Sequence, residues 1–100
     1  MNKAAQIIKP LYDESTTRVH DVIENDVFGE DRKKVFAAHD AVKAIYAYAT
    51  PGNQAVVRTF EDVVDFAKGY IEECEEDDDW NAVIERNVMQ NILDLLLAAL

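Results

Sequence analysis

Apolar residues recur every three or four positions along most of the chain, which is the spacing of one face of an α-helix. This pattern predicts helical segments over residues 2–25, 30–49, 54–76 and 80–100. The clearest break between them is 50–53, Thr-Pro-Gly-Asn, which is typical of a turn. Because no stretch alternates cleanly between apolar and polar residues, we expect an all-α fold. The prediction is a compact bundle of four to five helices in a single domain, residues 1–100.

The exact number of helices depends on a few residues that interrupt the pattern. Pro10 lacks a backbone N–H, so it either kinks the first helix or opens a second one after a polar turn at 13–17. Asn53 is expected to cap the third helix. Gly69 predicts a local break or bend in that helix. The second helix carries alanines on several faces, which places it centrally, where neighbours can approach closely.

The last helical segment loses its polar face beyond Asn91. A helix that is apolar all round is normally buried all round. One interpretation is a surface for self-association or for a partner. The other is a terminal helix threaded through a small core. Under the first interpretation the candidate oligomer interface consists of Leu93, Leu96, Leu97 and Leu100.

Charge changes this picture, because it is distributed unevenly. The formal net charge is −10. Residues 1–60 contain eight acids and eight bases, whereas residues 61–100 contain twelve acids and two bases. Ten of those acids lie between Glu61 and Asp79, where Lys68 is the single base. Such a chain should repel nucleic acid and anionic lipid, so its expected counterparts are cations or proteins with a basic surface.

The acidic run permits three interpretations. It is a solvated helix face, or a surface that binds a basic protein groove by occupying the sites of phosphates, or a metal site. Under the second interpretation, the partner-binding residues are Asp62, Asp65, Glu72, Glu73, Glu76, Asp77, Asp78 and Asp79.

The metal interpretation depends on the pairs Asp62-x-x-Asp65 and Glu72-x-x-Glu75, which supply the oxygen ligands that Mg²⁺ and Ca²⁺ prefer. This spacing resembles the acidic helix pairs of the all-α nucleotide pyrophosphatases of the MazG type. The resemblance implies a metal-dependent hydrolase. It covers these four residues only, and it lacks the second acidic motif on a facing helix.

Other candidate chemical residues favour no catalytic site. His20 and His39 each precede an aspartate, but sequence neighbours do not face each other on a helix. Ser15 has no nucleophile motif around it, and no glycine-rich loop is present to cradle phosphate. The acidic neighbours of Cys74 disfavour its thiolate. We therefore expect no enzyme activity, no catalytic residue, no cofactor and no bound metal.

Surface and compartment features complete the expectations. The basic cluster 32–34 is expected to pair with acids of a neighbouring helix or of another subunit. Phe66 and Tyr48 fall off their apolar stripes, so each is packed by a neighbouring element or is an interface anchor. The first residues show no signal peptide, and the longest apolar run, 95–100, is too short to span a bilayer. With one cysteine, the expected location is cytoplasmic.

In size, acidity and its run of carboxylates the chain resembles the small phage-encoded inhibitors of the anti-restriction and anti-CRISPR type. The resemblance implies a DNA-mimicking protein that works by stoichiometric binding to a basic, nucleic-acid-binding groove. The expected partner is thus a protein with a basic surface, without direct binding to nucleic acid or membrane. The alternatives are a structural or adaptor subunit, such as a homodimer held by the last helix, and the metal-dependent hydrolase.

Overall fold

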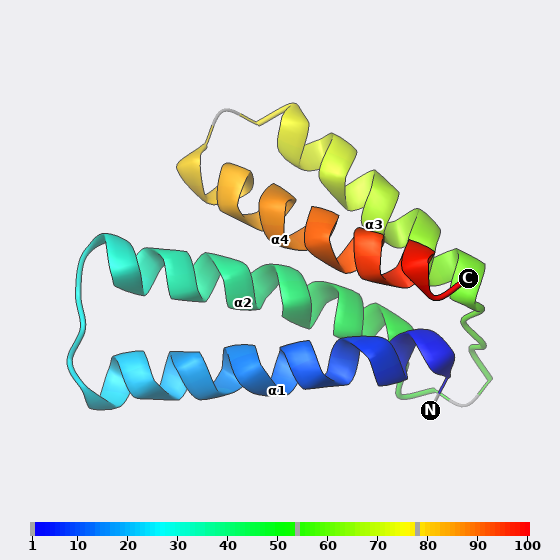
Figure 1. Cartoon of the computed structure of the whole chain (residues 1–100), viewed down its shortest axis with the longest axis horizontal. Helices are drawn as coiled ribbons and strands as arrows, with labels where there is room; N and C mark the ends of the chain where they lie inside the picture. Colours follow the sequence, from blue (N-terminus) through cyan, green and yellow to red (C-terminus); the bar gives the residue numbers. More distant parts are fainter. Residues whose placement is uncertain (1, 54, 78) are drawn as a thin grey trace.

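Four helices make up the fold in a computed structural model that describes residues 2–53, 55–77 and 79–100. They are α1 (Lys3–Glu24), α2 (Glu30–Ala49), α3 (Phe60–Glu75) and α4 (Trp80–Ala98). α1 pairs with α2 and α3 pairs with α4 as two hairpins, and α4 lies against α2 (Figure 1). The predicted all-α bundle is confirmed, with four helices in the described ranges.

The first helix is not divided at Pro10, contrary to one of the two expectations. α1 is continuous, with Pro10 inside it, and the polar stretch 13–17 is helical rather than a turn. The hydroxyls of Thr16 and Thr17 donate to backbone carbonyls one turn earlier, at 2.9 and 3.1 Å. Hydroxyl side chains can satisfy themselves in this way within a helix, so a polar run need not end it.

The third helix begins six residues later than predicted. Its N-cap is Thr59, whose hydroxyl accepts from the backbone N–H of Asp62 at 3.0 Å, while the Asp62 carboxylate accepts from the Thr59 N–H at 2.9 Å. This reciprocal pair is a capping box. Asn53 instead accepts from the Ala55 N–H at 2.9 Å, inside the segment between α2 and α3, which we call the connector. From Phe60, α3 continues unbroken through Gly69, so the bend expected there is absent.

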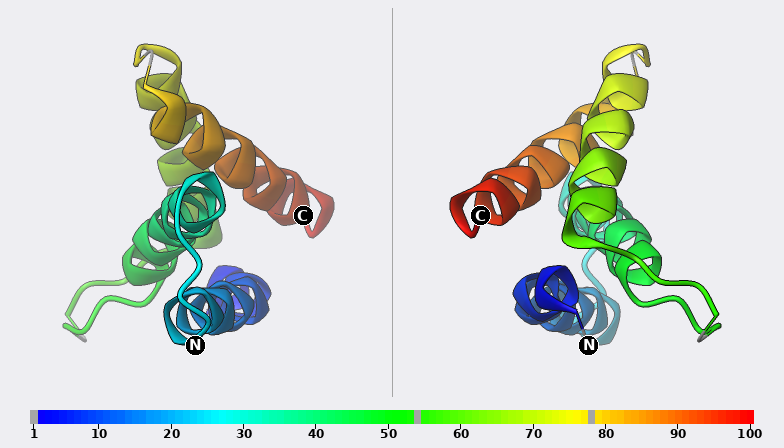
Figure 2. Two further views of the ribbon diagram at one scale, coloured as in Figure 1. Left: turned by 90° about the vertical axis from the view of Figure 1, so that its left-hand side faces the viewer. Right: turned by 90° about the vertical axis from the view of Figure 1, so that its right-hand side faces the viewer.

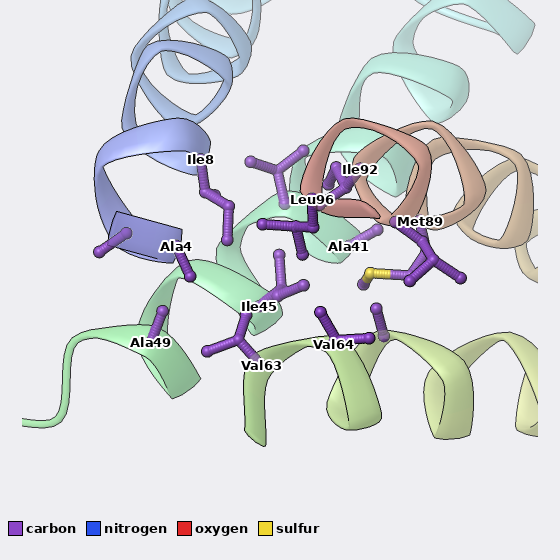
Figure 3. Close-up of a cluster of buried hydrophobic side chains, with 14 of the residues drawn as sticks. Ala4, Ile8, Ala41, Ile45, Ala49, Val63, Val64, Met89, Ile92 and Leu96 are labelled. Atoms are coloured by element: carbon purple, nitrogen blue, oxygen red, sulfur yellow. The ribbon is translucent and has the colours of Figure 1, made fainter. Parts of the chain in front are cut away.

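The core forms where all four helices meet, and α2 contacts each of the others, as its alanine-rich faces predicted. Figure 3 shows side chains from the four helices converging between the ribbons. Small residues allow this close approach: Ala41 and Ala4 are both fully buried. The largest fully buried side chains are Ile8, Ile45, Val63, Met89, Ile92 and Leu96.

The apolar end of α4 divides into a buried and an exposed part, which corrects the predicted oligomer interface. Leu93 and Leu96 are 7% and 0% exposed, because they point into the core of their own chain. Leu97 and Leu100 are 42% and 82% exposed. Leu93 and Leu96 are therefore core residues of the single chain and are not available to a second chain. None of the helices within the described ranges is long and apolar enough to cross a membrane.

The two aromatic residues that fell off their stripes pack against each other. The rings of Tyr48 on α2 and Phe66 on α3 stack with their centroids 4.4 Å apart. The Arg58 guanidinium lies 4.1 Å from the centre of the Tyr48 ring. These side chains thus join α2 to α3 and to the connector, which favours the packing interpretation over that of interface anchors.

Candidate functional site

The outward side of α3 presents a row of carboxylates. Its inward side buries Val63, Val64, Ala67 and Ile71, and this burial turns the opposite side to solvent. We call the exposed carboxylates on that side the acidic face, which consists of Glu61, Asp65, Glu72, Glu73 and Glu76. At about 1.5 Å per residue, it extends over roughly 22 Å along the helix. Glu61 belongs to it although it was not among the predicted binding residues.

Three of the predicted binding residues have structural roles at helix ends instead. The backbone N–H of Thr59, together with the Thr59 side chain, lowers the pKa of Asp62 below its ordinary value. Asp79 is the N-cap of α4 and accepts from the backbone N–H of Asn81 at 3.2 Å. Asp77 accepts from the backbone N–H of Asp79 at 2.9 Å. Asp78 lies outside the described residues.

The members of the acidic face have no such role. Within the described ranges, none of these carboxylates takes part in a hydrogen bond or an ion pair. Their neighbour Glu75 differs, because its Oε1 accepts from Arg86 Nε at 3.1 Å. The structure therefore separates the acidic run into residues that cap helices, one that pairs with α4, and a remainder without a partner.

The position of three members of the acidic face is unfavourable for stability. Glu72, Glu73 and Glu76 lie in or next to the last turn of the helix, and that turn contains no basic residue. The carboxyl end of a helix carries a partial negative charge, so an anion there costs about 0.3–1 kcal/mol before screening by salt. Carboxylates three or four residues apart add repulsion of tenths of a kcal/mol per pair. Glu61 differs, because it lies in the first turn of α3, where an anion is favourable.

The pairs proposed as metal ligands are not assembled into a site. Asp62 is engaged in the capping box, and Glu75 is paired with Arg86. In the described part of the chain, no group of three or more His, Cys, Asp or Glu side chains is placed to hold a metal ion. Both pairs lie on α3, without a facing acidic motif. The arrangement gives no support to the hydrolase alternative.

A serine and a histidine that are far apart in sequence meet between α1 and α2. Ser15 Oγ lies 2.8 Å from His39 Nδ1 and donates to the Tyr12 carbonyl oxygen at 3.0 Å. The direction of the Ser15–His39 hydrogen bond depends on the tautomer of the imidazole, because a protonated Nδ1 donates and an unprotonated Nδ1 accepts. The contact is a tie between helices that sequence spacing could not reveal.

A second polar tie joins α3 to α4. The Tyr70 hydroxyl donates to Glu85 Oε1 at 2.6 Å. Burial and this hydrogen bond raise the pKa of Tyr70 above its ordinary value of 10.0. Burial, reinforced by Glu85 and Glu73, also raises the pKa of the nearby Cys74 thiol. The thiolate is thus disfavoured, as the sequence predicted, with desolvation as the larger cause.

The Tyr70 tie predicts a distinctive alkaline titration. The Tyr70 phenol should ionise above pH 10 in the folded protein, and the variant Tyr70→Phe identifies its signal by removing it. The variant Glu85→Gln should lower the midpoint of this ionisation. Above pH 10 the unfolded chain releases this proton while the folded chain retains it. The contribution to stability is therefore present below pH 10 and is lost as the pH rises through the folded pKa. Phenolate absorbance of wild type minus Tyr70→Phe measures the midpoint, and a value at or below 10 would contradict the hydrogen bond.

The basic cluster at the start of α2 does not pair with the acidic face. The Arg32 guanidinium lies over the rings of Phe28 and Phe36, at 5.5 and 5.2 Å from their centres. No ion pair joins Lys33 or Lys34 to another described residue. The cluster borders a cleft of about 370 Å³ between the first turns of α2 and α4. The basic cluster is thus not the counterpart of the acidic face, and the one base among those carboxylates is Lys68 on α3 itself.

The protein is an all-α bundle of two helical hairpins. Its third helix carries an acidic face that has no partner among the described residues. Comparison of the chain with protein-family models, with curated proteins and with solved structures gives no match.

Proposed function

We propose that the chain is a non-enzymatic interaction protein that binds a target stoichiometrically through the acidic face of α3. The target has a basic surface that ordinarily binds nucleic acid, and the carboxylates occupy positions that phosphates would take. Binding inhibits the target by covering that surface. The proposed setting is the cytoplasm, where such targets act, and the proposed parallel is with DNA-mimicking phage inhibitors.

One observation carries this proposal: the carboxylates of the acidic face are exposed and have no partner within the described residues, although the placement of Glu72, Glu73 and Glu76 is costly to the helix. A row of like charges on one helix raises the local potential, which speeds the encounter with an oppositely charged surface. Pairing with Arg or Lys of the target would remove the internal repulsion. Relief of this repulsion would thus contribute favourably to the free energy of binding.

Capture from a bacterial lysate tests the proposal. Wild type is compared with Asp65→Asn/Glu72→Gln/Glu73→Gln/Glu76→Gln, which removes four charges from α3 but keeps side-chain size. The matched control Asp21→Asn/Glu24→Gln/Glu30→Gln/Asp31→Asn removes four exposed charges from the ends of α1 and α2. We expect the target to be retained by wild type and control and lost by the α3 variant.

Salt provides an independent arm of the same experiment. In about 1 M salt, screening acts within roughly 3 Å, so retention by the acidic face should fall steeply. A protein held equally well at low and high salt, or equally by the α3 variant, would contradict the proposal.

A further inference from the structure

An apolar groove runs between α1 and α4, with α2 as its floor. Two adjoining hollows of about 230 and 250 Å³ share Ser15, Arg18 and Ala38 in their linings. Figure 2 shows the ribbons of α1 and α4 on different sides of α2, and residues of all three helices line the hollows. We call this feature the α1/α4 groove; its apolar lining comprises Leu11, Val35, Ala38, Val42, Ile84, Val88, Ile92 and Leu95.

The α4 wall of this groove has the spacing of a coiled-coil seam. Ile84, Val88, Asn91 and Leu95 follow one another at intervals of four, three and four residues, and all of them line the groove. Such a stripe packs against another helix. Here the chain covers only part of the stripe: Ile84 and Val88 are half-buried, and Asn91 and Leu95 are exposed. Leu95 consequently remains 47% exposed.

Charge favours a second copy of the chain as the occupant. The charged residues that line the groove are Glu14, Arg18 and Lys34, and Arg18 is paired with Glu14 at 2.6 Å. The lining thus carries one acid and two bases, whereas the molecule as a whole carries a net charge of −10. Two such anionic molecules repel one another unless they meet through a face of this kind.

The polar residue in the seam favours a self-complementary arrangement. Asn91 lies in the middle of the stripe, so a two-fold axis through it would bring each Asn91 against its own copy. An amide both donates and accepts hydrogen bonds, so two identical amides can satisfy each other. A single Asn in an apolar seam is also a device that fixes register.

The same two-fold axis brings opposite charges together at the two ends of the groove. Arg18 and Lys34 border the hollow that contains Ile84, toward the amino end of α4. In an antiparallel pair, that end faces the carboxyl half of the other copy's α4. This half carries the negative end of the helix dipole and the exposed Asp94, which would meet Lys34 favourably, whereas Arg18 is already paired with Glu14.

We propose that two copies of the chain associate antiparallel through the α1/α4 groove, so that α1 and α4 of each copy form an intermolecular four-helix bundle centred on Asn91. The residues that line the α1/α4 groove belong to α1, α2 and α4, so the acidic face of α3 is not part of it. The dimer is therefore independent of target binding, and each can fail without the other.

Sedimentation equilibrium tests the dimer. Wild type should show twice the chain mass of 11.3 kDa at micromolar concentration. Leu95→Lys, in the groove, should return the mass to 11.3 kDa, whereas Leu97→Lys, equally exposed but outside the groove, should remain dimeric. Both variants should keep the circular dichroism of the folded chain. A monomeric wild type, or a dimer that only Leu97→Lys dissolves, would overturn the proposal.

Cross-linking tests the position of the axis. In a Cys74→Ala background, Asn91→Cys should form a covalent dimer under mild oxidation, because a disulfide needs Cα atoms within about 7 Å. Val83→Cys, on an exposed side of α4 outside the groove, should stay monomeric on denaturing gels. A covalent dimer from Val83→Cys but not from Asn91→Cys would contradict this geometry.

Discussion

Replacing Leu96 with alanine is expected to lower the free energy of unfolding by about 2–5 kcal/mol, since it removes a buried side chain and leaves a cavity. Leu96 is 0% exposed and packs in the core shared by all four helices. Domains of this kind are stable by only about 5–15 kcal/mol, so the loss is a large fraction of the total. For a chain of 100 residues, each kcal/mol corresponds to about 4–8 °C in Tm.

The neighbouring residue supplies the control. Leu97 is 42% exposed, so Leu97→Ala should cost well under half as much as Leu96→Ala. Thermal and urea unfolding, followed by circular dichroism, measure both variants. Equal destabilisation by the two changes would mean that the buried side of α4 is assigned to the wrong residues.

Reversing charge on α3 is expected to change stability and binding in opposite directions. In Glu72→Lys/Glu73→Lys, two cations replace two anions near the carboxyl end of the helix. The change removes an unfavourable interaction with the helix dipole and creates attractions to Glu76 and Asp77. We expect the free energy of unfolding to rise by about 1 kcal/mol at low salt, with the gain shrinking as salt is added. Capture of the target should be lost.

A second charge reversal distinguishes the effect of where the charges lie from the effect of the change in net charge. Glu30→Lys/Asp31→Lys alters the net charge of −10 by the same amount, but it lies in the first turn of α2. Anions are favourable at a helix start, so this variant should be less stable than wild type while it still captures the target. If both reversals shifted Tm in the same direction, the dipole argument would be wrong.

Much of the fold was predictable from the spacing of apolar residues, and the failures have identifiable causes. The central position of α2 followed from its alanines, which are buried at Ala37 and Ala41. The start of α3 was misplaced because Asn53 looked like a cap. The Thr59-x-x-Asp62 pair in the same sequence is the stronger signal, since both of its side chains bond to the backbone.

The candidate site was predictable as a region but not residue by residue. Sequence located the surplus of carboxylates, yet it could not distinguish Asp79, which caps α4, from Glu73, which has no partner in the described ranges. Likewise, the apolar end of α4 gave no means to separate Leu96 from Leu97. That distinction depends on how α4 is rotated against α2 and α3, which is a property of packing between distant segments.

The most direct measurement of the central claim is the equilibrium affinity of the captured target for wild type and for the two reversal variants at low salt. If the acidic face of α3 is the binding surface, Glu72→Lys/Glu73→Lys should weaken binding by about 10- to 1,000-fold. Glu30→Lys/Asp31→Lys should leave it within a few-fold of wild type. Equal losses in both variants, or unchanged affinity in the α3 variant, would contradict the account.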